Sequence, residues 1–175
     1  GWSFSHAVLR ETLEQISQDE GRWADTNLHC ARAIRSVHPR AEHLMPGRIG
    51  VHLMKAGRIE IATTLLLQGA RQHMAACEYR EAPEQLDQRE QALQSMGVPQ
   101  DDPRLIRGWI ARANSYLQQG RPHHALEWAL KASRGTRERP NKLLHARALN
   151  HLADVCRHRG ESQQAQAHYL ESLRH

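Results

Sequence analysis

Thirteen histidines raise the question of metal binding. His151, Asp154 and His158 recur at steps of three and four residues, so on a helix they share one face. Zinc needs three or four ligand atoms at about 2.0–2.3 Å. Residues seven apart lie about 10 Å apart along a helix axis, which is too far for one ion to bind both histidines. We interpret the row as a polar helix face and predict neither a metal nor a cofactor.

Thiol chemistry would need a cysteine beside an activating base. Cys30, Cys77 and Cys156 are widely spaced and form no CxxC pair. Cys156 is in phase with Leu149 and Leu152, on an apolar stripe where a thiol behaves as a small hydrophobic group. This pattern predicts reduced, buried thiols in a cytoplasmic protein.

Nucleotide chemistry has no motif here. The sequence contains no GxxxxGK[ST] loop, no HRD-like loop and no DFG. The stretch HAVLRE places His6, Arg10 and Glu11 close together, but only the first two share a helix face. We predict that this stretch packs in the structure, with Arg10 or Glu11 contacting the helix that carries Arg22 and His29.

The composition is that of a globular chain long enough for one domain or one repeat array: 175 residues, 39% hydrophobic and 25% charged. The net charge of +5 is scattered, which disfavours nucleic-acid binding. Lysine occurs only three times, so arginine carries nearly all the positive charge, as is typical of a GC-rich, bacterial genome. No apolar run of about 18 residues predicts a membrane span. The start at Gly-Trp, without a signal-peptide pattern, suggests a piece of a longer protein.

Helices must position all of these side chains, because apolar residues recur at three- and four-residue steps almost throughout. "RIEIATTLLL" is rich in β-branched residues, but its pattern continues in helical phase. Gly120 and Gly160 stand where left-handed turns end helices. The pattern predicts helices over residues 4–16, 23–34, 42–55, 58–74, 80–96, 104–119, 122–136, 141–159 and 161–174.

The last four helices repeat with a period of 40 residues. When Gly120 is aligned with Gly160, Ala113 matches Ala153 and Ala125 matches Ala165. Small residues at such places let two helices cross closely. A fainter copy surrounds Gly57, with Ala62 in the matching place. Helical hairpins repeating at this interval predict an all-α, right-handed α-solenoid.

The repeat resembles the tetratricopeptide repeat (TPR). The first unit has the family's pattern at Trp109, Ala113, Tyr116, Gly120, Ala125 and Ala132, and the second keeps Leu149, Ala153, Gly160, Ala165 and Tyr169. Cys156 and Ser172 depart from it. The resemblance implies a superhelix of TPR-like hairpins that binds protein or peptide ligands.

A second resemblance begins at the front of the chain. "FSHAVLRE", "GRWADTNLHCARAI" and "HLMKAGRIEIATTLLLQGA" look like segments of bacterial STAND-type signalling ATPases and of their fusions to serine/threonine kinases or transcription regulators. The resemblance implies that residues 1–40 are leading helices after a STAND module. Residues 41–175 would form the TPR-like array, with its best repeats at 104–139 and 141–174, in one continuous domain.

In TPR hairpins the first helix lines a concave groove. Two polar rows would face it here: Arg107, Ala111, Asn114 and Gln118, then Arg147, His151, Asp154 and His158, with Asn150 close by. Asparagine can bond both groups of a peptide backbone, and arginine can hold a carboxylate through two hydrogen bonds. Neither row contains a lysine, so a complete basic clamp for a terminal carboxylate is absent. The predicted binding residues are Arg107, Asn114, Gln118, Arg147, Asn150, Asp154 and His158.

The predicted function is protein or peptide recognition within a larger bacterial signalling protein, without catalysis in this stretch. Occupancy of the groove would change how an attached effector module is held. One alternative is a stand-alone TPR adaptor that self-associates through Trp2, Trp109 or the terminal "HYLESLRH". A metal or thiol enzyme is the other.

Overall fold

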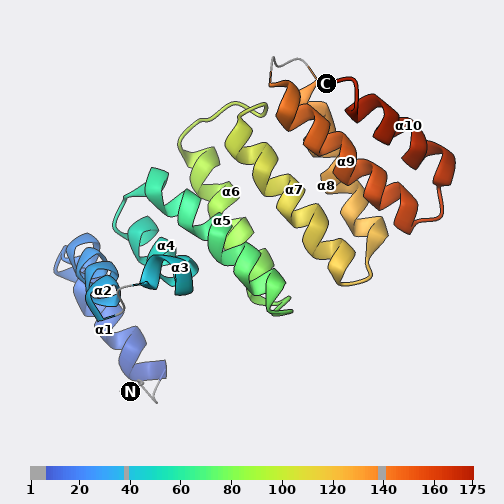
Figure 1. Ribbon diagram of the computed structural model, residues 1–175. Helices are drawn as coiled ribbons and strands as arrows, with labels where there is room; N and C mark the ends of the chain where they lie inside the picture. The colour runs from blue at the N-terminus through green and yellow to red at the C-terminus, as the bar shows by residue number, and fades with distance from the viewer. Residues whose placement is uncertain (1–6, 38–39, 138–140) are drawn as a thin grey trace. The chain divides into compact units, whose positions relative to one another are not determined.

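The computed structural model describes residues 7–37, 40–137 and 141–175, and within them the only regular elements are helices (Figure 1). These are α1 (Ala7–Asp19), α2 (Trp23–Val37), α3 (Ala41–Leu44), α4 (Pro46–Lys55), α5 (Ile59–Ala75), α6 (Glu81–Ser95), α7 (Pro103–Gln118), α8 (Pro122–Thr136), α9 (Lys142–His158) and α10 (Ser162–Ser172). The all-α prediction is confirmed. In the described part of the chain no helix combines the length and apolar character needed to cross a membrane.

The predicted helix over residues 42–55 is two helices, α3 and α4. Pro46 opens α4 at its first turn, where its missing N–H costs nothing because that turn has no carbonyl to receive it. Proline therefore breaks one predicted helix and starts the next.

Two compact units make up the chain, residues Gly1–Leu66 and Leu67–His175. Their boundary falls inside α5. In the first unit Ala62 is fully buried against Ile49 and Leu53. This position fits the small residue expected after the Gly57 turn.

Helix α1 is loosely packed. Val8 is 73% exposed and Leu13 45% exposed. Arg10 lies 4.0 Å from Glu14 of its own helix, an exposed pair of little energetic weight. The packing predicted for HAVLRE is therefore not found in the described part of the stretch, and His6, with Trp2, lies outside the described residues.

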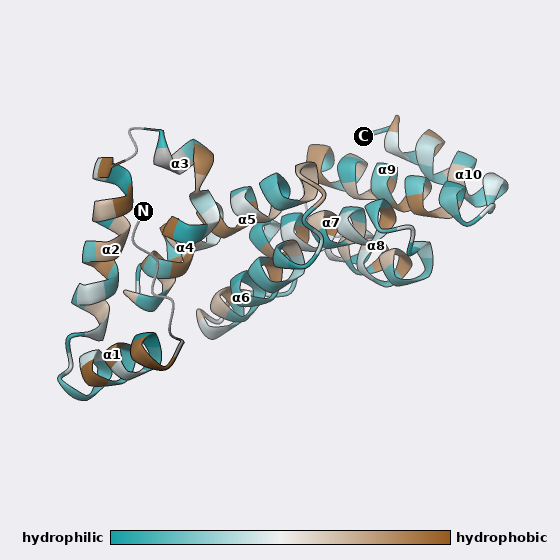
Figure 2. Cartoon of the chain, turned by 90° about the horizontal axis from the view of Figure 1, so that it is seen from below, coloured by the Kyte–Doolittle hydropathy of each residue, from teal (hydrophilic) through white to brown (hydrophobic). Residues whose placement is uncertain are grey.

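The second unit has two helical layers. Figure 2 shows the end of α5 in one row with α7 and α9, and α6 with α8 in the other. Where helices of a hairpin cross, Ala113, Ala125, Ala153 and Ala165 are at most 4% exposed, as the repeat predicts.

Left-handed residues end the first helix of each hairpin in this unit. Gly120 and Gly160 have φ of +68° and +80°, as predicted. Cys77, with φ of +60°, takes the same place between α5 and α6. Gly57 and Gly97, with φ of +73° and +68°, follow α4 and α6 in the same conformation, so a left-handed residue alone does not distinguish a first helix from a second. The end of α5 lies in one row with α7 and α9, the first helices of the repeat (Figure 2).

A buried polar network ties α6, α7 and α8 together around Trp109, which is 2% exposed. Its indole N–H donates to Glu90 Oε1 at 2.9 Å, and Lys131 Nζ donates to the same oxygen at 3.1 Å. Arg112 pairs with Glu90 at 3.5 Å and with Asp87. Trp109 is therefore a core residue and cannot be the self-association contact that the sequence suggested.

Candidate peptide-binding face

The two predicted rows lie on neighbouring first helices, α7 and α9, with the end of α5 beside them (Figures 1 and 2). Arg107 on α7 and Arg147 on α9 are exposed, 40 residues apart, at matching places of the repeat. Arg71 on α5 is exposed as well. We call Arg71, Arg107 and Arg147 the arginine face. Within the described residues none of the three has a carboxylate partner.

These arginines are close enough to act on one another. Partial burial lowers the pKa of Arg71, and the charges of Arg107 and Arg147 lower it further. Three positive groups that repel one another form a surface on which a bound carboxylate would relieve the repulsion.

A fourth arginine strengthens this field from inside the second unit. Arg89 of α6 is 3% exposed, and its pKa falls to about 10, first through burial and then through Arg71, Arg104 and Arg107. A Cβ at Gly108 would lie 2.7 Å from Arg89 Nη1, so glycine there makes room for the guanidinium beside Arg107. Asp102 favours the charged form of Arg89 and offsets only part of this effect.

The rest of the α7 row is mixed. Asn114 is partly exposed and Gln118 is exposed. Ala111 is 5% exposed and belongs to the same core cluster as Met74 and Leu86, so its place in the predicted groove row was wrong. The usable row on α7 is Arg107, Asn114 and Gln118.

On α9 the hairpin partner engages two of the predicted residues. Tyr169 donates its hydroxyl to Asp154 Oδ1 at 2.6 Å, and Ser172 donates to Asn150 Oδ1 at 2.6 Å. These oxygens hold α10 in place. His158 is exposed but lies eleven residues beyond Arg147, about 16 Å along the axis. The structure thus brings Arg147 together with Arg107 and Arg71, and not with His158.

His151 connects this face to pH. Burial lowers its pKa, Asp154 opposes the change, and Arg147 and Arg71 lower the pKa further. Between the folded pKa and the ordinary value near 6.5, the unfolded chain binds more protons at this site than the folded chain does. Stability contributed by neutral His151 is therefore present above that range and is lost as the pH falls through it.

We expect His151→Gln to reduce the loss of unfolding free energy between about pH 7.5 and pH 5.5. Urea unfolding at several pH values measures this loss. An unchanged slope in the variant would show that His151 takes up its proton equally in both states.

Sequence reasoning missed Arg71 and Arg89. Arg71 precedes Arg107 by 36 residues, close to the repeat period, and this spacing was a usable signal. Arg89 gave no signal, since a charged residue on a second helix is usually solvated.

Two other candidate functional sites have weaker support than the arginine face. A hollow of about 600 Å³ is lined by acidic and basic side chains together, among them Asp101, Glu127 and Lys131. Its lysine already pairs with Glu90. Cys156 is buried and its pKa is raised by burial and by Glu161, which makes it a poor nucleophile. Cys30 is only partly buried and Cys77 is exposed, so the prediction of buried thiols is correct for Cys156 alone.

Proteins of known structure resemble this chain in fold. The chain matches two crystal structures of TPR-like repeats from a Podosopora anserina protein assigned as a kinesin light chain, one of them a substituted variant. Each is 20% identical with a TM-score of 0.53; the matches cover 94% and 98% of this chain and 92% and 96% of those chains. No curated protein matches. Residues 105–175 match the tetratricopeptide repeat family, and the fold of the chain is that of an α-helical repeat solenoid.

Proposed function

We propose that this protein binds an acidic, extended peptide segment of a partner protein along α5, α7 and α9. TPR repeats generally mediate contacts between proteins. The observation that carries the proposal is the arginine face: three exposed guanidiniums on successive first helices, without a carboxylate partner among the described residues. A guanidinium holds a carboxylate through two parallel hydrogen bonds, and such charge-assisted bonds are among the strongest in proteins.

A peptide would form more interactions with this face than an isolated anion would. Asn114 stands two helical turns beyond Arg107, and its amide can donate to and accept from a peptide backbone. Acidic side chains on that peptide would meet Arg71, Arg107 and Arg147 in turn. The same positive charge could attract the phosphates of a nucleic acid. Phosphates carry no hydrogen-bond donor, however, so they cannot bond to the amide oxygen of Asn114.

The wider setting follows from the resemblance to STAND-type signalling proteins. In this proposal the repeat array is the sensor or scaffold region of a bacterial signal-transduction protein, and peptide occupancy changes how an attached effector module is held. The alternative is a stand-alone adaptor that self-associates. Leu170 and Leu173, which are 52% and 82% exposed, favour the terminal helix as the contact in that case.

The test compares two triple variants of equal charge. One removes the arginine face, Arg71→Gln with Arg107→Gln and Arg147→Gln. The other replaces the exposed Arg80, Arg134 and Arg174 with glutamine. The probe is a short labelled peptide of alternating Glu and Ser, measured by fluorescence anisotropy at fixed salt.

We expect the arginine-face variant to bind the peptide about 100-fold more weakly, because each lost charged contact costs at least about 1 kcal/mol. Its melting temperature should not fall, since within the described part of the chain none of the three guanidiniums makes a hydrogen bond or ion pair that the substitution would remove. The control variant should bind within about threefold of the wild type.

Three results would contradict the proposal. Equal weakening in both variants would indicate a diffuse charge effect. No binding by the wild type would remove the acidic peptide as ligand. Tighter binding of a labelled single-stranded RNA than of the peptide, with a steep salt dependence, would assign the face to nucleic acid instead.

A further inference from the structure

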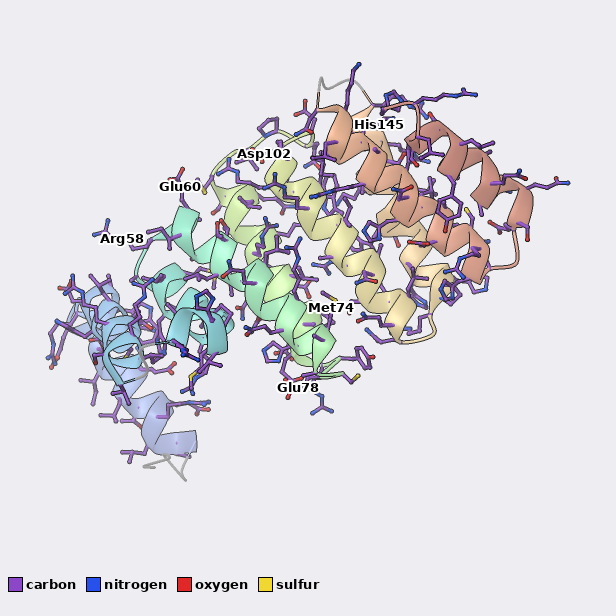
Figure 3. The ribbon with its side chains drawn as sticks, in the orientation of Figure 1. Arg58, Glu60, Met74, Glu78, Asp102 and His145 are labelled. Atoms are coloured by element: carbon purple, nitrogen blue, oxygen red, sulfur yellow. The ribbon has the colours of Figure 1, made fainter. Side chains whose placement is uncertain are left out.

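Three metal-binding side chains meet at the open end of the last hairpin, away from its Gly160 turn. They are His145 near the start of α9, labelled in Figure 3, Glu171 near the end of α10, and His175 just beyond it. One ligand atom from each residue lies within 4.8 Å of the other two. The rings of His145 and His175 stand edge to face, with 4.8 Å between their centroids.

Thr136 fixes which nitrogen of His145 can bind a metal. Its hydroxyl donates to the carbonyl of Ser133 at 2.8 Å, so Oγ1 is left to accept from Nδ1 of His145, also at 2.8 Å. With the hydroxyl hydrogen assigned to the Ser133 carbonyl, Nδ1 carries the proton and Nε2 keeps its lone pair. Thr136 is 2% exposed, and this bond holds the imidazole in one orientation, as the outer partners of metal-binding histidines do.

The other two ligands can adjust. Glu171 and His175 are exposed, so small rotations of their side chains bring the ligand atoms, which lie within 4.8 Å of one another, to the separations of about 3.4 Å found around a tetrahedral ion. The nearby charges are mixed. Arg137 acts on His145, and His168 lies 3.8 Å from Glu171. Glu171 attracts a divalent cation and Arg137 repels it. We expect the direct bond to the Glu171 carboxylate to outweigh the repulsion by one arginine at the edge of the site.

We propose that His145, Glu171 and His175 bind one divalent transition-metal ion, Zn²⁺ by its preference for imidazole and carboxylate ligands, with a water molecule completing the tetrahedron. The ion joins α9 to the end of α10 and fastens the hairpin at the end that has no connecting turn. It is a structural site, independent of the arginine face. The sequence predicted no metal site here, because 26 residues separate His145 from Glu171 and no short motif joins them.

The experiment titrates Zn²⁺ alone into the metal-free chain by calorimetry. Wild type is compared with His145→Ala, Glu171→Gln and Thr136→Val. The matched control is His123→Ala, which removes an exposed histidine of α8. We expect one Zn²⁺ per chain, at least tenfold weaker binding in each of the first two variants, and about tenfold weaker binding in Thr136→Val through loss of the outer hydrogen bond.

Stability gives a second reading. Zn²⁺ should raise the melting temperature of wild type and His123→Ala, but not of His145→Ala. Undiminished Zn²⁺ affinity in His145→Ala and Glu171→Gln, or equal loss in His123→Ala, would overturn the site. So would the absence of any binding by the wild type. Peptide binding by the arginine face stands or falls separately.

Discussion

Trp109→Ala should lower the free energy of unfolding by about 3–5 kcal/mol, the range for removing a buried aromatic side chain. Trp109 is 2% exposed and packs with Ile106, Leu93 and Ala132 in one core cluster. The variant leaves a cavity between the two helical layers and also removes the N–H that Glu90 accepts. Urea unfolding followed by circular dichroism measures the change.

Trp109→Phe is the matched control. Phenylalanine keeps most of the packing and loses the hydrogen bond, so we expect about 1–2 kcal/mol. A loss below about 1 kcal/mol in Trp109→Ala would mean that the second unit is not organised around this side chain. If the alanine variant does not fold, the phenylalanine variant still gives a measurable comparison with the wild type.

Glu90→Ala should lower the free energy of unfolding by about 3 kcal/mol. Glu90 accepts hydrogen bonds from Trp109 and Lys131 and pairs with Arg112, whose side chain is only 8% exposed. Removing one member of a buried charge network leaves the others without their counter-charge, which is more costly than losing a surface pair. Arg112 keeps Asp87, and Lys131 keeps the faces of Trp109 and Trp128, so the loss stays near the lower end for such networks.

Glu127→Ala on α8 provides the comparison. Glu127 is exposed, and its loss should change the unfolding free energy by no more than about 0.5 kcal/mol. Similar losses in the two variants would show that the network contributes no more than an ordinary surface carboxylate.

Much of the fold could be predicted from the sequence, because it is local. Helix periodicity, the turn glycines Gly120 and Gly160, and the alanines at helix crossings each act within one hairpin. Which helix is the first and which the second in each hairpin is a less local property. Cys77 adopts the left-handed conformation in place of glycine, so the turn between α5 and α6 carried no glycine signal.

The site was predicted less completely, because it depends on neighbours that sequence spacing does not reveal. Arg107 and Arg147 were found through the repeat, but Arg71 and Arg89 were not. Asn150 and Asp154 were predicted to bind the ligand from their helix face, and Oδ1 of each accepts a hydrogen bond from a side chain of α10. The partner helix determines which hydrogen bonds such a polar side chain makes. Helical periodicity gives the face on which the side chain lies, but not these partners.

The most direct test of the arginine face is to record which residues respond to the acidic peptide. Titration of the ¹⁵N-labelled protein with the Glu–Ser peptide should shift the side-chain Nε–Hε signals of Arg71, Arg107 and Arg147 together with the backbone signals of α7 and α9. Signals from α6 and α8 should move less. Shifts confined to other arginines, or spread evenly over all of them, would contradict the assignment of this face as the binding site.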